Sequence, residues 1–308
     1  MSERTATGPL AGRHVVITGG SSGIGRASAV AVAGRGATVL LLARRSDELD
    51  QVVTDIRDAG GSAFGFPCDI TDSTAVSTTV AAILAEHGHV DMLVNNAGRS
   101  IRRSVYRSTD RLHDYERTMA VNYFGAVAMV LALLPHFRER KQGHVVNISN
   151  AGVQISMPRY SAYLASKAAL DKFTDVVAAE TLADRITFTT IHMPLVDTPM
   201  IAPSGRHNAG PAATPEWAAA TVVRALTERP KRIDVPAATI AEYGALIAPR
   251  LKDAVMHRLY RQYPETPAAK GEAPAAEQGA ERRSTPGVST RVGRAAARLG
   301  KFVPGAQW

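Results

Sequence analysis

Short apolar runs alternate with amphipathic stretches of helix length along most of the chain, and this alternation constrains the fold most strongly. The expected strands are His14–Ile17, Thr38–Leu42, Ala63–Phe66, Met92–Val94, His144–Ile148, Thr187–Ile191 and Arg232–Val235. The expected helices lie near Ile24–Ala33, Asp47–Ala59, Ser73–Glu86, Leu112–Leu134, Ser161–Leu182 and Pro215–Leu226. The runs are apolar on both faces, as in buried parallel strands. The pattern predicts a single Rossmann-type, doubly wound parallel α/β sheet of about seven strands, with right-handed crossovers and a C-terminal extension.

Composition narrows the class of protein. The 308 residues are 45% hydrophobic and 21% charged, which are ordinary globular values. The single cysteine excludes a disulfide framework and any multi-cysteine metal centre, so we expect no metal site. We find no uncharged apolar run of about 18 residues and no signal-peptide core near the N-terminus. These features predict a protein of the cytoplasm.

The net charge of +8 is concentrated near the C-terminus. Residues 282–308 contain no acid, and their basic residues are Arg282, Arg283, Arg291, Arg294, Arg298 and Lys301. The rest of the chain is close to balanced, which argues against a nucleic-acid partner.

Three regions are expected along the chain. Residues 1–262 form the Rossmann-type domain, including a proline-rich loop at 193–213 that is too long for a tight connection and suits a binding loop. Residues 263–290, rich in Pro, Ala, Gly, Glu and Ser, form a flexible linker. Residues 291–308 form a basic helix or tail. The tail has two open interpretations: weak peripheral contact with an anionic membrane, or a helix that is solvated or packed on a neighbouring subunit.

A glycine-rich loop follows the first expected strand. It reads TGGSSGIG from Thr18 to Gly25, and Gly19, Gly23 and Gly25 permit a tight turn close to a ligand. The next helix directs its free N–H groups and positive dipole end toward the loop. The loop therefore predicts a pyrophosphate site.

The end of the second strand indicates which dinucleotide binds. Sheets that select NAD usually carry an acid there, whereas this chain has Ala43 followed by Arg44 and Arg45. A guanidinium suits a 2′-phosphate, so the sequence favours NADP(H). A solvated basic pair is the alternative.

Tyr163 and Lys167 are four residues apart and share one helix face. An ammonium beside a phenol favours the phenolate, so we expect the pKa of Tyr163 to fall below its usual value of about 10. Such a phenol can exchange a proton with a carbonyl or alcohol oxygen.

Together with these motifs, Cys68–Ile70, Asn95–Gly98, Asn122 in MAVNYFGAV and Met193–Thr198 resemble the short-chain dehydrogenase/reductase family over about residues 10–235. The resemblance implies cofactor contacts from Gly19, Ser21, Ser22, Gly23, Ile24, Gly25, Arg44, Arg45, Asp69, Ile70, Asn96, Ala97, Gly98, Tyr163, Lys167, Pro194, Val196 and Thr198. It also implies that Lys167 holds the nicotinamide ribose and that Asn122 supports a proton-carrying water.

One position departs from the family. Its catalytic serine stands thirteen residues before the tyrosine, where this chain has Asn150, and Ser149 is adjacent. Neighbours on a strand point to opposite faces, so only one of the two can meet the substrate. We favour Asn150, whose amide N–H can polarise a carbonyl oxygen. A local shift that brings in Ser149, or an impaired site, remains open.

Longer stretches, including Asn95–Ser104, His113–Val127 and Phe188–Pro203, are similar to the short-chain fatty acyl-CoA reductases. That similarity implies reduction of an acyl-CoA thioester by NADPH to a fatty aldehyde and free CoA, with Tyr163 as general acid. It also implies a homodimer or homotetramer.

Expected substrate contacts are of two kinds. Arg99, Arg102 and Arg103 suit CoA phosphates, or form a solvated loop. Residues suited to an acyl channel, or to core packing, are Met193, Leu195, Met200, Ile201 and Tyr243. Asp197 stands where the similar group has a basic or neutral residue. A ketone, a 3-oxoacyl group or a long-chain alcohol therefore remains open as substrate, as does a scaffold that binds NADPH without turnover.

Overall fold

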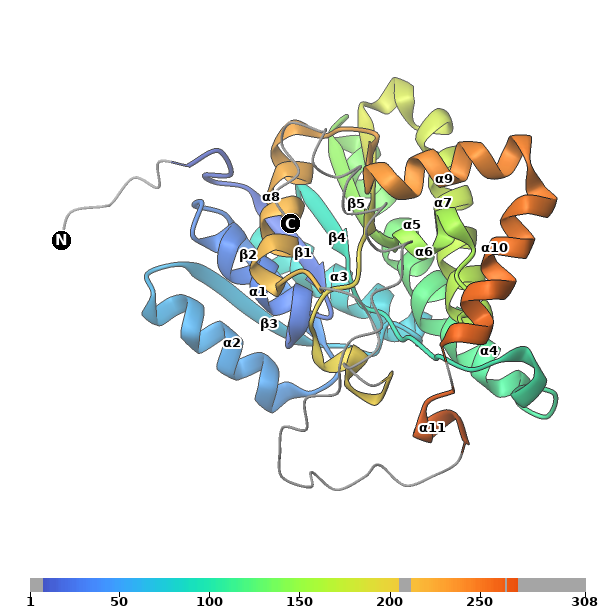
Figure 1. Ribbon diagram of the computed structural model, residues 1–308. Coiled ribbons are helices and arrows are strands. Elements are labelled where there is room, and N and C mark those ends of the chain that lie inside the picture. Colours follow the sequence, from blue (N-terminus) through green and yellow to red (C-terminus); the bar gives the residue numbers. More distant parts are fainter. Residues whose placement is uncertain (1–7, 205–211, 264, 271–308) are drawn as a thin grey trace. The chain divides into compact units, whose positions relative to one another are not determined.

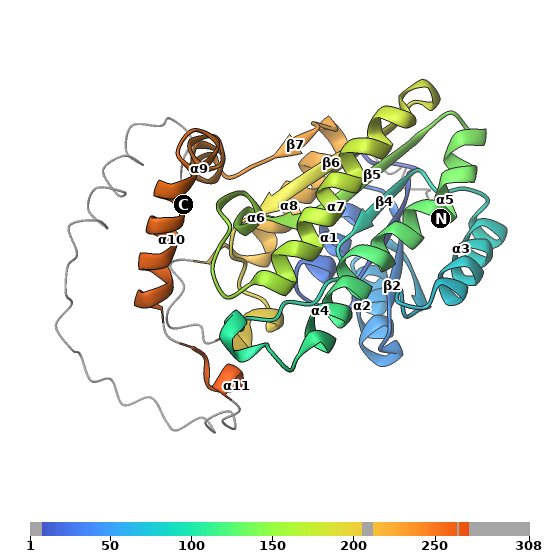
Figure 2. The same cartoon turned by 90° about the vertical axis from the view of Figure 1, so that its right-hand side faces the viewer.

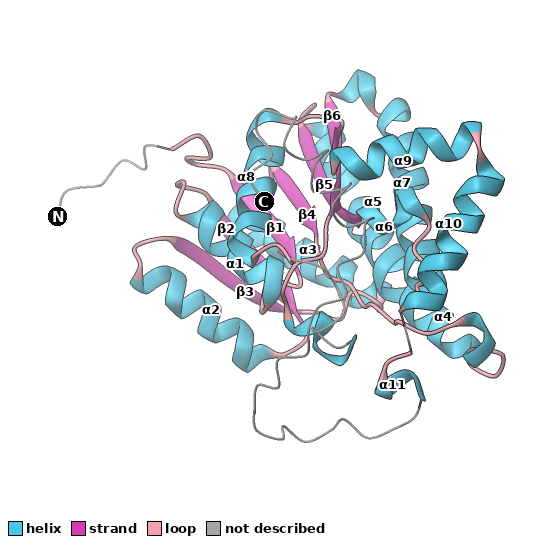
Figure 3. Ribbon diagram, in the orientation of Figure 1, coloured by secondary structure: helices cyan, strands magenta, loops and turns pink. Residues whose placement is uncertain are grey.

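The computed structural model describes residues 8–204, 212–263 and 265–270. Its centre is a seven-stranded parallel sheet with the order β3-β2-β1-β4-β5-β6-β7 (Figures 1 and 3). The strands are β1 (His14–Thr18), β2 (Thr38–Ala43), β3 (Ser62–Pro67), β4 (Met92–Asn95), β5 (Gly143–Asn150), β6 (Ile186–Met193) and β7 (Arg232–Ile233). The predicted Rossmann-type sheet is confirmed.

Helices cover both faces of the sheet. The described helices before β7 are α1 (Gly23–Ala33), α2 (Ser46–Asp58), α3 (Ser73–His87), α4 (Leu112–Met119), α5 (Ala126–Glu139), α6 (Ala151–Ile155), α7 (Ser161–Glu180) and α8 (Pro215–Glu228). One hydrophobic core joins α1, α2 and α8 to the sheet, and the other joins α3 and α5 to it, with α7 packed against that second core.

The last crossover differs from the expectation. The connections β5–α7–β6 and β6–α8–β7 advance in the same direction across the sheet, but α7 and α8 lie on opposite faces. The α8 crossover therefore has the opposite hand, and the expectation of right-handed crossovers throughout was wrong for it. The small side chains of Ala218 and Ala219 let α8 bury one side in the core that also contains α1.

A continuous helical stretch, Leu112–Glu139, joins α4 to α5 through a π-helical turn at Ala120–Gly125. An 18-residue window of this stretch has a mean hydropathy of 1.7, which would allow it to cross a membrane, although core helices of soluble proteins have the same length and composition. In this fold Met129, Leu133 and Phe137 are buried in the core beneath the sheet. The wider turn carries Asn122, and such π-bulges are frequent at functional sites.

Two helices that the sequence analysis did not identify follow β7: α9 (Pro236–Ile247) and α10 (Pro249–Gln262). Both begin with proline at the first helical position, where its missing N–H costs no hydrogen bond. They lie beyond the β6–β7 side of the sheet (Figure 2).

The expected linker begins with a packed segment. The short helix α11 (Pro267–Lys270) follows Thr266, which is buried, and the Arg103 side chain donates to the Ala269 carbonyl oxygen at 3.0 Å. The remainder of that linker and the basic tail lie outside the described residues, so the division into three regions stays a prediction.

The strand order places the site. The chain leaves β1 and β4 toward opposite edges of the sheet, and a crevice opens at their carboxyl ends. The glycine-rich loop follows β1, and the segment Asn96–Gly98 follows β4.

Candidate active site

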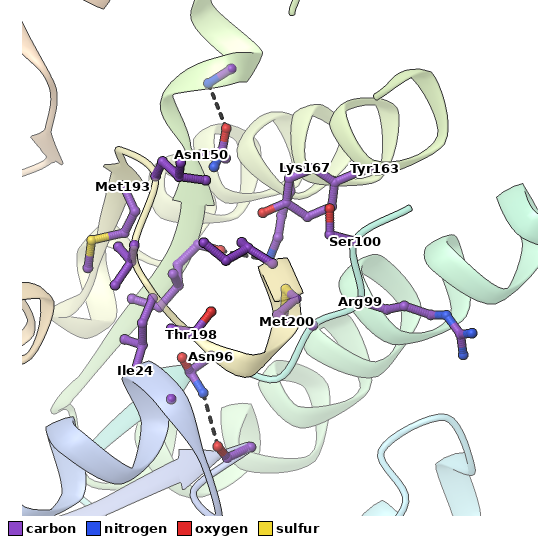
Figure 4. Close-up of a pocket in the computed structure, with 18 of the residues that line it drawn as sticks. Ile24, Asn96, Arg99, Ser100, Asn150, Tyr163, Lys167, Met193, Thr198 and Met200 are labelled. Atoms are coloured by element: carbon purple, nitrogen blue, oxygen red, sulfur yellow. Dashed lines mark hydrogen bonds between the residues drawn. The ribbon is translucent and has the colours of Figure 1, made fainter. Parts of the chain in front are cut away.

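A cavity of about 970 Å³ extends along the carboxyl ends of the strands (Figure 4). The predicted site residues that line it are Gly19, Ser21, Ser22, Gly23, Ile24, Arg44, Arg45, Asp69, Ile70, Asn96, Ala97, Gly98, Arg99, Arg102, Ser149, Asn150, Tyr163, Lys167, Met193, Pro194, Leu195, Val196, Thr198, Met200 and Ile201. Four predicted residues, Gly25, Arg103, Asn122 and Tyr243, are not part of this lining.

The glycine-rich loop packs tightly against the end of β4. Gly19 has φ +66°, and a Cβ atom there would lie 2.9 Å from the Cα atom of Ala97. At Gly25 a Cβ atom would lie 2.1 Å from the carbonyl oxygen of Gly19. Gly25 therefore acts behind the cavity surface, by allowing the first turn of α1 to approach the loop.

Hydrogen bonds hold these two segments together. The Thr18 hydroxyl oxygen accepts from the backbone N–H groups of Asn96 and Ala97, both at 3.0 Å. The Asn96 amide donates to the carbonyl oxygens of Thr18 at 2.9 Å and Gly19 at 3.2 Å. These hydrogen bonds therefore hold the glycine-rich loop and the segment after β4 in one arrangement at the base of the crevice.

Basic side chains lie at the end of β2. Arg45 pairs with Glu48 at 2.6 Å, and Arg44 lies near Asp69 on the next strand end. Burial opposes ionisation of Asp69, but hydrogen bonds from Thr71 and the Arg44 charge outweigh it and lower the pKa of this carboxyl. Ala43 leaves the end of β2 without a carboxylate.

Tyr163 and Lys167 both extend from α7 into the cavity (Figure 4). The Lys167 ammonium donates to the Ile148 carbonyl oxygen at 2.7 Å, and burial lowers its pKa to about 8. Burial raises the pKa of Tyr163 above its usual value, and the nearby Tyr160 and Asp171 add to the increase. The expected lowering is therefore wrong for these described residues, because desolvation of the phenol dominates.

The side chains of Asn150 and Ser149 have different partners in the structure. The Asn150 side chain lies near enough to Tyr163 to lower the pKa of its phenol, and its carbonyl oxygen accepts from the Gly152 backbone N–H at 2.7 Å, which caps α6. The Ser149 hydroxyl instead donates to Asp171 at 3.1 Å. Of the two neighbours, Asn150 is thus the one whose side chain lies near the phenol.

Asn122 lies behind the cavity wall. Its amide donates to the Arg99 carbonyl oxygen at 2.9 Å and to the Ser166 hydroxyl at 2.8 Å, and its carbonyl oxygen accepts from the Arg99 N–H at 2.8 Å. It therefore fixes the segment after β4 relative to α7.

The three arginines predicted to bind phosphate do not all lie at the cavity. Arg99 and Arg102 line the cavity, although the Arg99 side chain extends away from Tyr163 and Lys167 in Figure 4. Arg103 faces elsewhere: it pairs with Asp114 at 3.5 Å and donates to the Ala269 carbonyl oxygen. The expected phosphate contact from Arg103 is not supported, because its side chain is bonded to Asp114 of α4 and to Ala269 of α11.

Comparison with known proteins agrees with this geometry. The model of the family described as "short chain dehydrogenase" matches residues 13–209. The chain belongs to the short-chain dehydrogenase family. A protein named fatty acyl-CoA reductase from Acinetobacter baylyi is 48% identical over 261 residues, which cover 85% of this chain and 88% of that protein.

Two solved structures of short-chain dehydrogenases are also similar. A short-chain dehydrogenase from Streptomyces avermitilis has a TM-score of 0.68 and 31% identity, over 82% of this chain and 98% of that one. A metagenomic short-chain oxidoreductase in complex with NADP has a TM-score of 0.63 and 28% identity, over 74% of this chain and 96% of that one.

Sequence reasoning missed one wall of this short-chain dehydrogenase site. Leu259, Tyr260 and Tyr263 of α10 and its C-terminal end line the cavity, as do Arg159 and Tyr160 before α7. The spacing of Met256, Tyr260 and Tyr263 is helical and could have indicated an amphipathic helix. The expected channel residue Tyr243 lies on α9 and is exposed, so it does not contribute to this wall.

An ionic network centred on the buried His192 lies on the side of β5 that carries Ser149. The His192 ring bonds Asp171 at 2.9 Å and Asp234 at 2.6 Å, and Arg232 joins Asp234 to Glu242 of α9. Burial opposes charge on the imidazole, but the two carboxylates outweigh it and raise the pKa of His192. The network connects α7, β6 and α9.

We expect Gly25→Ala to destabilise the protein by about 1–3 kcal/mol, because the added methyl group clashes with backbone. The free energy of unfolding from urea titration measures this. Gly244→Ala in α9 is the control, since a Cβ atom there meets nothing within 4 Å. Equal stability of the two variants would contradict the packing described for Gly25.

His192→Gln should destabilise the protein most in mildly acidic solution. A raised folded pKa gives stability that is complete below the unfolded pKa of about 6.5 and is lost as the pH rises through the folded value. The difference in unfolding free energy between wild type and variant should therefore be larger near about pH 6 than near about pH 9. His257→Gln, on exposed α10, is the control. A difference that grows with pH would refute the charged network.

Proposed function

We propose that this short-chain dehydrogenase is an NADPH-dependent reductase that converts a fatty acyl-CoA to a fatty aldehyde. The observation that carries the proposal is the convergence of Tyr163, Lys167 and Asn150 in one cavity that begins at the glycine-rich loop. The 48% identity to a protein named fatty acyl-CoA reductase supports the substrate class.

The residues present fit a nicotinamide dinucleotide. The backbone at Gly19 and Gly23 has positive φ, and the cavity extends from this loop to the Tyr163 phenol. The N–H groups at the start of α1 suit the pyrophosphate. Arg44 and Arg45 suit a 2′-phosphate, and Ala43 places no carboxylate to repel it. The similar metagenomic enzyme in complex with NADP supports this choice of cofactor.

The proposed chemistry uses few side chains of the protein. Bound NADPH supplies a hydride to the thioester carbon. The Tyr163 phenol is protonated at neutral pH and donates its proton to the thioester oxygen. The resulting hemithioacetal releases free CoA and leaves the aldehyde, so the balance is one acyl-CoA, one NADPH and one proton.

Asn150 and Lys167 support the phenol. The Asn150 amide can donate to the same oxygen and stabilise the negative charge that develops there. Lys167, with a pKa of about 8, is mostly cationic at neutral pH, and its bond to the Ile148 carbonyl oxygen fixes its direction. We assign it to the nicotinamide ribose.

The rest of the cavity suits the two parts of an acyl-CoA. Met193, Leu195 and Met200 present apolar surface for the acyl chain. Arg99 and Arg102 are the lining cations that follow β4, and we assign them to CoA phosphates.

A substrate panel tests the function. Acyl-CoAs of several lengths, ketones and alcohols are offered with NADPH and with NADH, and products are identified by mass spectrometry. We expect aldehyde and free CoA from long-chain acyl-CoA with NADPH, and loss of turnover in Tyr163→Phe. Turnover of ketones alone would assign a different carbonyl substrate, and NADPH binding without turnover would favour the scaffold.

Asn150→Ala should lower kcat by roughly a hundredfold to a thousandfold, as for loss of a donor to a developing oxyanion. Asn150→Asp is the matched control, because it keeps the acceptor that caps α6 but removes the amide donor. Both variants should lose turnover, and Ser149→Ala should retain it. Intact turnover in Asn150→Ala with abolished turnover in Ser149→Ala would reverse the assignment.

Arg44→Ala should raise the KM for NADPH by roughly tenfold to a hundredfold, because a charge-assisted bond to the 2′-phosphate is lost. The KM for NADH should change little. Arg45→Ala is the comparison, since Arg45 also pairs with Glu48. An equal loss with both cofactors would show that Arg44 does not read the 2′-phosphate.

A further inference from the structure

Large apolar side chains are exposed on α9 and α10. They are Ile240 (74% exposed), Tyr243 (60%), Leu246 (76%), Ile247 (87%), Leu251 (64%) and Val255 (47%), and we call them the hairpin surface. Ile240, Tyr243 and Ile247 recur at helical spacing and share one face of α9. Soluble monomers rarely expose extended apolar patches, and larger patches mark protein or membrane contacts.

Cations accompany this surface on α10. Arg250, Arg258 and Arg261 form no ion pair with any other described residue. The two acids of the helix pair are both engaged: Glu242 with Arg232 at 2.9 Å, and Asp253 with Lys252 at 3.7 Å. The charge left over on the hairpin is therefore positive.

An adjoining face of α10 is a wall of the cavity. Leu259, Tyr260 and Tyr263 line it. The Tyr260 ring lies under the Arg159 guanidinium at 4.1 Å, and its hydroxyl bonds Ser104 at 3.0 Å. The same helix thus carries residues of the cavity wall beside exposed apolar and basic residues.

We propose that the hairpin surface docks on an anionic lipid bilayer, with its apolar side chains in the headgroup region and its arginines at lipid phosphates. An amphipathic helix binds in this way when apolar burial and attraction to anionic lipid act together. The benefit to catalysis rests on the proposed function, because a fatty acyl chain held in the bilayer would meet the cavity beside α10.

Charge selects this occupant over two others. A second copy of the hairpin would bring like charges together, and residues 271–308 of the same chain are also net positive, with six Lys/Arg against three Glu. An anionic bilayer is complementary to both the apolar and the basic parts of the surface.

Vesicle flotation of the full chain tests the proposal. The vesicles are phosphatidylcholine alone or phosphatidylcholine mixed with phosphatidylglycerol. We expect binding to the mixed vesicles that weakens with salt, and little binding to the neutral ones. Replacing Arg250, Arg258 and Arg261 by Glu should lower the partition coefficient by at least roughly fivefold for each arginine.

An apolar variant, Leu246→Ser/Ile247→Ser/Leu251→Ser, should also lose binding. The matched control Leu112→Ser/Leu182→Ser removes exposed leucines elsewhere and should bind normally. Normal vesicle binding by both hairpin variants would overturn the proposal. So would loss of binding only on deletion of residues 271–308, which would identify the tail as the contact. No vesicle binding by wild type, with a change of mass in light scattering for the apolar variant, would identify a subunit interface instead.

Activity separates docking from catalysis. With a short-chain, water-soluble acyl-CoA and no vesicles, both hairpin variants should turn over as wild type does. With long-chain acyl-CoA held in mixed vesicles, they should be slower. If wild type reduces no acyl-CoA but its vesicle binding still depends on the hairpin, the proposed function fails and the docking surface stands.

Discussion

The close approach of the β1–α1 loop to the end of β4 is the contact on which the site depends. Gly25 lets α1 begin directly against Gly19, and the Thr18 hydroxyl accepts two N–H groups from the segment after β4. Because buried backbone groups need partners, these bonds make one arrangement of the two segments much more favourable than others. The dinucleotide cradle and the wall that carries Arg99 are thereby fixed together.

The pleat of β5 gives its neighbouring residues Ser149 and Asn150 different surroundings. Ser149 and Asn150 point to opposite faces, so one enters the network of Asp171 and His192 while the other meets Tyr163. A one-residue change of register would exchange them. The ionic network therefore does more than hold α7 and α9: it occupies the Ser149 hydroxyl, while the Asn150 side chain stays near the phenol.

The sheet and its main helices were predictable because their signals are local: runs of apolar residues, periodicity, and glycines at a strand end. The side of the sheet that α8 covers was not predictable, since it depends on how Ala218 and its neighbours pack on α1. Arg103 followed a recognisable motif, yet its partner Ala269 is distant in sequence. The α10 wall was missed because its apolar side chains are divided between a cavity and an exposed face.

The pKa of Tyr163 shows most clearly where spacing alone fails. Four-residue spacing places Lys167 on the same helix face, but desolvation acts on the phenol as well, and in the folded chain it is the larger effect. A buried phenol with a raised pKa keeps its proton at neutral pH. Oxidation of an alcohol would need the phenolate at the start, whereas reduction of a thioester needs the protonated form. Burial therefore leaves the phenol in the protonated form from which the proposed reduction would start.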